Sequence, residues 1–293
     1  MISVIMPAYN VENYITKAIR SVLNQTYRDI QLIVVNDCST DKTETIAKEL
    51  IKNDPRALLV KTEKNVGVGG ARAVGYEYAT GDYIILADAD DWYDLDYFQN
   101  MYNAAVKNNA DMVSSGITII DELGGIHVEP EEAGVYEGDD KLKHVWANGK
   151  ITYTCNKLIK RWLFEKVPIK PRRYIEDTPV TVPQIFYANI VAVINNNGFY
   201  HRLNYDSICH RATKIEDFLY RTLCWCELVE FFLKEAPHYV YNSNLLATVT
   251  ADLDVLNGLP FTAEEFEKYN QLWAEVTYKL FRYVKITQID FKI

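Results

Sequence analysis

The sequence predicts an α/β fold, with a doubly wound parallel sheet in the first part of the chain and helices at its end. Short apolar runs alternate with stripes of helical period through the first third. The strand runs are almost continuously apolar, which is typical of parallel sheets covered by helices on both faces. From about residue 215 the helical period returns with many aromatic side chains, which predicts a C-terminal helical region.

The expected elements follow one another in strict alternation. Strands are predicted over 2–6, 30–35, 57–60 and 83–87, and helical stripes over 11–23, 46–51 and 70–79. Residues 126–140 are acidic and rich in glycine, which predicts a solvated loop over or beside the crevice. Residues 151–215 mix the two periods.

Composition excludes several classes of protein. A net charge of −9 without a basic block in the first two hundred positions argues against nucleic acid as a partner. The amino terminus has no signal-peptide pattern, and no apolar run approaches the roughly 20 residues of a membrane span. The cysteines form no CxxC pair, which is typical of a reducing compartment. We expect a cytoplasmic protein and leave open attachment to the inner membrane surface. The cysteines are Cys38, Cys155, Cys209, Cys224 and Cys226. The last two are expected to pack within an apolar helix, and the alternative is a metal-binding pair.

Polar residues directly follow three of the predicted strands. They are the segments Pro7-Ala8-Tyr9-Asn10, Asn36-Asp37 and Asp88-Ala89-Asp90-Asp91. Because ligands of doubly wound sheets bind at the carboxyl ends of the strands, these segments should surround one crevice.

The run Asp88-Ala89-Asp90-Asp91 is the sharpest feature of the sequence. Clustered carboxylates repel one another, and a hard cation such as Mg²⁺ or Mn²⁺ relieves the repulsion. The alternative is a solvated acidic turn before the next helix.

Asp37 ends the second strand, where a carboxylate can accept a hydrogen bond from the imide N–H of uracil. The alternative is a helix cap, but Ser39 or Asp41 can supply that cap and leave Asp37 free. Arg72 follows the glycine run 67–70 and can reach the base or the phosphates. That run lacks the third glycine of the dinucleotide fingerprint, which disfavours an NAD site.

The segment Glu176-Asp177-Thr178-Pro179 has the pattern of a helix start. One interpretation is a cap alone. The other is a general base, because the helix dipole favours the charged carboxylate there.

Together these segments resemble glycosyltransferase family 2, over roughly residues 1 to 215. The order of the motifs is more specific than any one of them. They are 6–10 (Met-Pro-Ala-Tyr-Asn), 34–41 (Val-Val-Asn-Asp-Cys-Ser-Thr-Asp), 65–72, 87–92 (Ala-Asp-Ala-Asp-Asp-Trp) and 176–179 (Glu-Asp-Thr-Pro).

The resemblance implies a GT-A fold, which is Rossmann-like with a doubly wound mixed sheet, followed by a C-terminal helical extension. It implies a nucleotide-sugar-binding half over 1–115, an acceptor-binding half over 116–215 and a helical region over 216–293. It also implies a role for each matching residue. Pro7, Ala8 and Tyr9 form the nucleoside wall, Asp37 and Arg72 belong to the nucleotide site, Asp88 and Asp90 bind donor and metal as the DxD pair, and Asp177 is the catalytic base.

Two features of the resemblance leave questions open. Many family members have Asp-Asp-Gly-Ser where this chain has Asn36-Asp37-Cys38-Ser39, so the second aspartate is retained and cysteine replaces the glycine of the turn. A histidine after the acidic motif completes the metal shell in some relatives. His201 and His210 are the candidates, and a surface or phosphate-facing histidine is the alternative.

The function implied is transfer of a sugar from a nucleotide-diphosphate sugar, with UDP favoured, to a hydroxyl of a glycan or lipid-linked acceptor. We expect Mn²⁺ or Mg²⁺ dependence, inversion and a place in cell-surface polysaccharide synthesis. The alternative is a non-catalytic relative that binds nucleotide sugar or acts as a scaffold. In the tail, Leu272, Val276, Leu280 and Val284 share a helical face near Lys279, Arg282, Lys285 and Lys292. That stretch is expected either to pack on the protein or to lie at a membrane surface.

Overall fold

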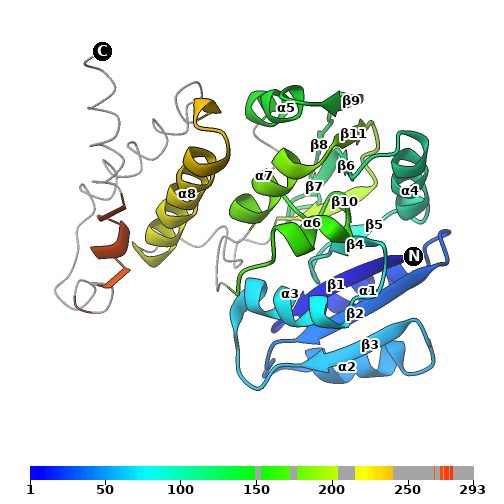
Figure 1. Ribbon diagram of the computed structural model, residues 1–293. Helices are drawn as coiled ribbons and strands as arrows, with labels where there is room; N and C mark the ends of the chain where they lie inside the picture. Colours follow the sequence, from blue (N-terminus) through cyan, green and yellow to red (C-terminus); the bar gives the residue numbers. More distant parts are fainter. Residues whose placement is uncertain are drawn as a thin grey trace, which may run out of the picture. The chain divides into compact units, whose positions relative to one another are not determined.

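The computed structural model of the protein describes residues 1–148, 153–171, 177–203 and 215–239, and in the tail residues 267, 271–272, 274–276 and 278–279. The chain divides into two compact units, Met1–Ser207 and Ile208–Ile293. The first unit contains both β-sheets and helices α1 to α7, and the second contains helix α8 (Figure 1).

The larger sheet has eight strands in the order β3-β2-β1-β4-β10-β6-β11-β9. Strands β10 and β9 run antiparallel to their neighbours, and the other neighbouring pairs are parallel, so the sheet is mixed. All four strands predicted in the first third are present. The strands are β1 (Ile2–Ala8), β2 (Ile30–Asn36), β3 (Ala57–Lys61), β4 (Tyr83–Leu86), β6 (Met112–Ser115), β9 (Gly134–Glu137), β10 (Lys157–Lys160) and β11 (Ile190–Ile194).

A smaller sheet is formed largely by strands that follow β4, β6 and β11 along the chain. Its order is β5-β12-β7-β8, with β5 (Trp92–Tyr93), β7 (Ile117–Ile120), β8 (Ile126–Glu129) and β12 (Phe199–Arg202). The prediction of a solvated loop over 126–140 was wrong, because the segment contains edge strands β8 and β9. Each strand has only four residues, and the apolar side chains Ile126, Val128 and Val135 are exposed. Such a short alternation within an acidic segment does not by itself indicate a strand.

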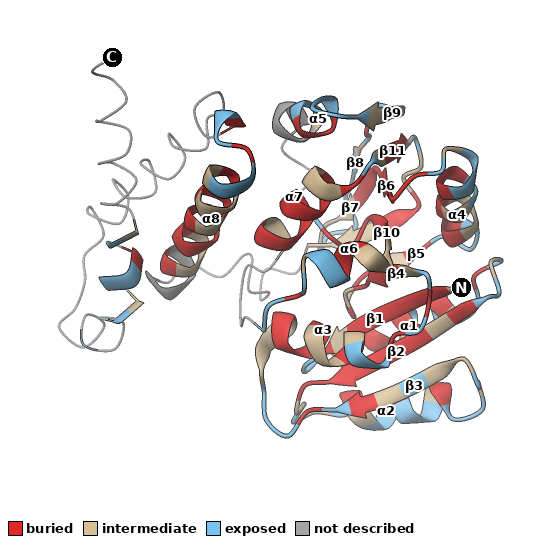
Figure 2. Cartoon of the chain, in the orientation of Figure 1, coloured by how far each residue is buried: buried red, intermediate tan, exposed pale blue. Residues whose placement is uncertain are grey.

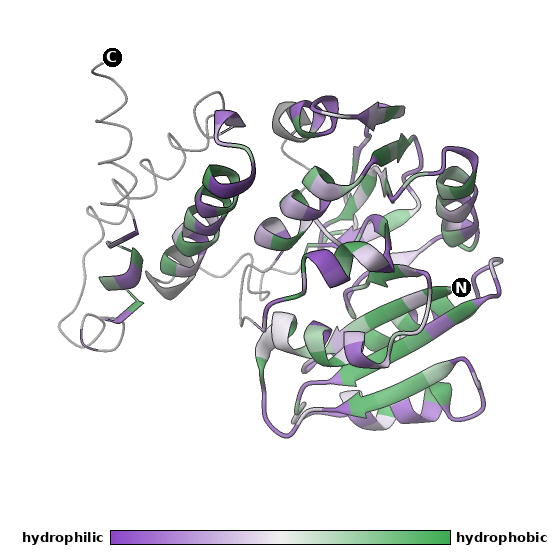
Figure 3. Cartoon of the chain, in the orientation of Figure 1, coloured by the Kyte–Doolittle hydropathy of each residue, from purple (hydrophilic) through white to green (hydrophobic). Residues whose placement is uncertain are grey.

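Helices cover the larger sheet, and the apolar side chains of the inner strands are buried between the layers (Figures 2 and 3). Burial of these side chains is the main source of stability for such a layered fold. The helices of the first unit are α1 (Ile15–Leu23), α2 (Thr43–Ile51), α3 (Gly67–Tyr78), α4 (Tyr97–Lys107), α5 (Asp140–Asn148), α6 (Arg161–Lys166) and α7 (Asp177–Tyr187).

Gly75 lets helix α3 pack closely against strands β1 and β2. A Cβ atom at this position would lie 2.5 Å from Cγ2 of Ile5 and 3.0 Å from Cγ2 of Val35. Only glycine allows this approach. The close packing holds the buried first turns of α3 against the sheet, and these turns carry Arg72.

The second unit contains α8 (Ile215–Glu235), in which Cys224 and Cys226 are buried, as the packing interpretation expects. In the tail Val276 is buried, and Nζ of Lys279 lies 3.0 Å from Oε2 of Glu230 on α8. These contacts favour packing for this part of the tail, whereas Leu280, Val284, Arg282, Lys285 and Lys292 lie outside the described residues. Among the helices described, none has the length and apolar character needed to span a bilayer.

Candidate active site

The carboxyl ends of β1, β2 and β4 bring the predicted polar segments to one edge of the sheet. Pairing of Ala8 with Asn36 and of Ile5 with Leu86 sets the register of these ends. Tyr9 follows β1 with 48% of its surface exposed, and Asp37 and Asp88 follow β2 and β4. Pro7 and Ala8 are the last two residues of β1 itself. The predicted nucleoside wall therefore lies at the same edge as Asp37 and Asp88, and its contact with a nucleoside stays a prediction.

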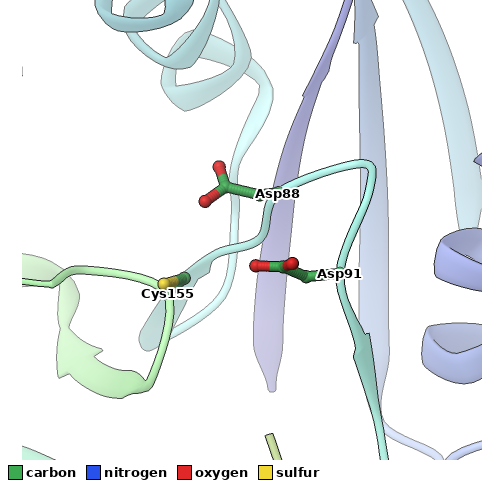
Figure 4. A group of neighbouring side chains, drawn as sticks. All are labelled: Asp88, Asp91 and Cys155. Carbon is green, nitrogen blue, oxygen red and sulfur yellow. The ribbon is translucent and has the colours of Figure 1, made fainter. Parts of the chain in front are cut away.

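The acidic loop after β4 approaches a turn from the other half of the unit. Single ligand atoms of Asp88, Asp91 and Cys155 lie within 4.8 Å of one another (Figure 4). Complete burial raises the pKa of the Cys155 thiol well above its ordinary value, so the thiol is protonated at neutral pH. The two carboxylates are therefore the better ligands for a hard cation.

Asp91 is fully buried and connects this loop to strand β12. Its Oδ1 accepts a hydrogen bond from the backbone N–H of Arg202 at 2.9 Å, and its Oδ2 lies 3.1 Å from Nδ1 of His201. Burial lowers the pKa of His201, but the hydrogen bond and charge of Asp91, with the charges of Asp88 and Asp90, outweigh burial and raise it to about 9. His201 is thus paired with Asp91 through Nδ1, and its role as a metal ligand stays a prediction. His210 lies outside the described residues.

Asp90 lies in the same loop, where it is close to the negative charges of Asp88 and Asp91. Burial, followed by the charges of Asp91 and Asp88, raises the pKa of Asp90 to about 7. A divalent cation would relieve this repulsion, so the donor set fits Mg²⁺ or Mn²⁺. The expected metal pair was Asp88 and Asp90, whereas the atoms grouped closely enough belong to Asp88 and Asp91. Local spacing alone does not show which aspartate of the loop turns inward.

Arg72 on α3 connects the acidic loop to helix α7. One guanidinium nitrogen, Nη2, lies 2.6 Å from Oδ1 of Asp88, and the other, Nη1, lies 2.7 Å from Oδ1 of Asp177. The Arg72 side chain is 3% exposed, whereas those of Asp88 and Asp177 are 31% and 30% exposed. Charge-assisted bonds from a planar fork of this kind are strong and directional. The buried guanidinium of Arg72 therefore pairs with both predicted functional carboxylates, Asp88 and Asp177.

Asp177 is the first residue of α7, as its sequence pattern predicts. Its Oδ1 also accepts a hydrogen bond from Oγ1 of Thr154 at 3.0 Å. Within the described residues no hydrogen bond reaches its Oδ2. Glu176, the preceding residue of the motif, lies outside the described residues. The carboxylate of Asp177 thus has one anchored oxygen and one available oxygen.

Asp37 is buried and caps helix α3. Its carboxylate accepts hydrogen bonds from Oγ1 of Thr62 at 2.8 Å, from N–H of Val66 at 2.9 Å and from N–H of Gly67 at 2.9 Å. The sequence argument that Ser39 or Asp41 leaves Asp37 free was wrong, because Asp37 caps a helix that begins 30 residues later. The N–H of Val66 also lies 3.2 Å from Oδ2, so both oxygens of Asp37 are engaged within the fold. A contact of Asp37 with a base stays a prediction.

The sequence analysis missed the turn that precedes β10. Thr154, Asn156 and Lys157 are buried there, and Lys157 is a charged side chain inside a protein core. Burial lowers the pKa of Lys157. The sequence does contain one hint of a buried polar turn, because Lys157 stands between Asn156 and the apolar residues that follow it. Nothing in that pattern indicates a contact with Asp177.

A search of protein families matches residues 3–168 to the model described as glycosyl transferase family 2. Putative glycosyltransferase EpsH of Bacillus subtilis is 30% identical over 221 residues, which cover 73% of this chain and 64% of EpsH. Glycosyltransferase GlyA of Streptococcus pneumoniae is 30% identical over 71% of this chain and 31% of its own length. The minor teichoic acid biosynthesis protein GgaB of B. subtilis is 43% identical over 54% of this chain and 18% of its own. The chain thus spans less than two thirds of the length of each of these relatives.

Solved structures of S. aureus TarS share the fold. The complex of TarS 1–349 with UDP-GlcNAc has a TM-score of 0.68 at 20% identity, and the match covers 95% of this chain and 81% of that one. The complex with UDP has a TM-score of 0.61 at 24% identity over 78% of this chain and 65% of that one. The likeness and the mixed sheet confirm the predicted α/β fold of GT-A type. With more than half of the chain matched by the family model, the protein belongs to glycosyl transferase family 2.

Proposed function

We propose that this chain transfers a sugar from a UDP-sugar to an acceptor hydroxyl, with inversion at the anomeric carbon, in the synthesis of a cell-surface glycan. The observation that carries the proposal is the position of Arg72 between Asp88 and Asp177. It joins a carboxylate of the donor edge to a carboxylate at a helix start in the other half of the unit. A transferase needs both groups around one reacting centre.

The donor side of the proposal rests on the acidic loop. Asp88 and Asp91, with Asp90 beside them, would hold Mn²⁺ or Mg²⁺, and such a cation supplies positive charge for a diphosphate leaving group. The likeness to TarS structures that contain UDP and UDP-GlcNAc supports a uridine donor. Tyr9 and Asp37 lie at the same edge and would contact the nucleoside.

The acceptor side of the proposal rests on Asp177. Its available Oδ2 would take the proton from the acceptor hydroxyl, whose oxygen forms a bond to the anomeric carbon. The bond from that carbon to the diphosphate breaks at the same time, and the diphosphate leaves with the electron pair. Attack from the face opposite the leaving group inverts the configuration. Arg72 and Thr154 keep Oδ1 out of this exchange.

The proposed acceptor class rests on the relatives. GgaB is described as a minor teichoic acid biosynthesis protein, and TuaG of B. subtilis, 32% identical over 124 residues, as a putative teichuronic acid biosynthesis glycosyltransferase. We therefore propose a cell-wall or capsular glycan, or its lipid-linked precursor, as the acceptor. With a lipid-linked acceptor, the transfer reaction would occur at the inner membrane surface.

Release of UDP from a panel of UDP-sugars tests the proposed function, with Mn²⁺, with Mg²⁺ and with chelator. We expect release from at least one sugar in the presence of a cation, and a large loss with chelator. Binding of UDP-sugar without any release would support the non-catalytic scaffold instead. Equal UDP affinity with and without chelator, measured by calorimetry, would contradict the metal assignment.

A further inference from the structure

Two elements that are distant in sequence hold the same oxygen of Asp177. Oδ1 accepts the Nη1–H of Arg72 from α3 and the hydroxyl of Thr154 from the turn before β10. The two donor atoms lie 2.7 and 3.0 Å from that oxygen. Two donors on one oxygen fix both the rotation of the carboxylate and the choice of the oxygen that remains available.

The turn that carries Thr154 is itself fixed by buried hydrogen bonds. Nζ of Lys157 donates to the carbonyl oxygen of Tyr153 and, at 2.8 Å, to Oδ1 of Asn156. The amide of Asn156 donates to the carbonyl of Ser115, and the hydroxyl of Tyr93 donates to the carbonyl of Cys155 at 3.1 Å. These bonds join the turn to strands β5, β6 and β10. Thr154 is 1% exposed, so its hydroxyl has little freedom to turn away.

We propose that Thr154 is a positioning residue for the catalytic base, and that it acts through its hydroxyl on Oδ1 of Asp177. The inference rests on the proposed function of Asp177. Arg72 alone leaves the carboxylate able to swing about a single bond, because one contact does not define its plane. Thr154 supplies the second contact and directs Oδ2 toward the acceptor. The contribution is to orientation, so it appears in turnover and not in donor affinity.

The chain offers a matched control on the same helix. Thr181 lies one turn after Asp177, is fully buried, and its hydroxyl has no hydrogen-bond partner among the described residues. Thr181→Val therefore makes the same chemical change as Thr154→Val without removing a contact to Asp177. Because valine has nearly the shape of threonine, both variants should keep the packing of the core.

The experiment compares wild type, Thr154→Val, Thr154→Ser and Thr181→Val by UDP release from UDP-N-acetylglucosamine or the best donor of the panel. A hydrogen bond to a charged group changes a rate by roughly ten-fold or more. We expect kcat of Thr154→Val to fall about ten-fold with an unchanged donor KM, Thr154→Ser to recover most of the loss, and Thr181→Val to match wild type. Wild-type kcat in Thr154→Val, or no recovery by serine, would overturn the proposal.

A crystallographic arm separates this proposal from the proposed function. In wild type the Asp177 carboxylate should occupy one orientation on Arg72 and Thr154, and in Thr154→Val it should rotate or split between two. An unchanged single orientation in Thr154→Val would overturn the positioning role whatever the activity. Absence of UDP release in wild type, with the reorientation observed, would instead contradict the transferase function alone.

Discussion

Two carboxylates that the sequence assigns to the active site have opposite environments. Asp37 is buried, and its oxygens accept hydrogen bonds from Thr62, Val66 and Gly67. Asp177 is 30% exposed, and only its Oδ1 is held, by Arg72 and Thr154. The first carboxylate is used mainly by the fold, whereas the second retains an oxygen that a substrate can reach.

The difference shows that the role of a carboxylate in a motif depends on how many of its acceptor positions are already occupied by hydrogen bonds within the protein. Asp37 builds the start of α3, and α3 in turn carries Arg72 to the site. Under the proposed function, Asp37 would act mainly through the placement of Arg72, and Asp177 would act through its own available oxygen.

The largest effect should come from Asp177→Asn. The amide keeps the size and helix-start geometry but has no basic oxygen, and general-base catalysis contributes about 10²–10⁴-fold. We expect turnover to fall by roughly that factor in steady-state UDP release. Asp94→Asn, the same change at an exposed position beyond the acidic loop, is the control and should keep wild-type turnover. Normal turnover in Asp177→Asn would move the base elsewhere, with Glu176 as the next candidate.

Arg72→Met should affect both sides of the comparison. It leaves the carboxylates of Asp88 and Asp177 without their shared cation. The loss of stability should be roughly 2 kcal/mol, below the value for fully buried pairs because both carboxylates remain partly hydrated. UDP affinity and turnover should both fall.

Arg56→Met is the control for Arg72→Met, because Arg56 pairs with Asp54 at 2.7 Å in a different part of the fold. It should lose stability in urea unfolding but keep UDP affinity. If Arg72→Met also kept wild-type UDP affinity and turnover, the bridge would be structural only.

Base selectivity tests whether Asp37 also contacts the base of the donor. Uracil carries an imide N–H, whereas the corresponding ring nitrogen of cytosine carries no proton. An unpaired buried acceptor costs about 1–3 kcal/mol, so UDP should bind roughly ten-fold more tightly than CDP by calorimetry. Equal affinities would leave Asp37 with the capping role alone. In either case Asp37→Ala should reduce stability by about 1 kcal/mol, as loss of a helix cap does.

The smallest effect concerns Cys38, the departure from the family pattern. Its φ of 59° lies in the left-handed region, where glycine is favoured over other residues. Cys38→Gly removes this strain but adds entropy to the unfolded chain, so the free energy of unfolding should rise by only about 0.5 kcal/mol. Urea unfolding measures the change. A clear destabilisation would show that the bond from Sγ to the carbonyl of Thr62, at 3.1 Å, outweighs the strain.

Local patterns were sufficient for the strands and helices of the first third and for the edge at which the polar segments meet. The apolar runs that become β1, β2 and β4 are buried on both faces, so their signal is strong. The edge strands β8 and β9 were missed, because each has only four residues and lies in an acidic segment that is typical of a loop.

Contacts between distant residues could not be predicted from the sequence. The bonds from Arg72 to Asp177 and from His201 to Asp91 span 105 and 110 positions, and each depends on the register of strands and helices between them. Thr154 and Lys157 belong to no motif recognised in the sequence. Only the structure shows that Thr154 contacts Asp177 and that Lys157 forms hydrogen bonds within the same turn. The sequence motifs predict which carboxylates are functional, whereas the structure shows which of their oxygens already accept hydrogen bonds.

The most direct test of the division between donor and acceptor sides is UDP affinity with Mn²⁺ for Asp88→Asn and Asp177→Asn, measured by calorimetry. Asp88→Asn should weaken UDP binding by roughly ten-fold or more, because a charged ligand of the cation is lost. Asp177→Asn should bind UDP as wild type does. Loss of UDP binding in Asp177→Asn would place Asp177 in the donor site and contradict the account.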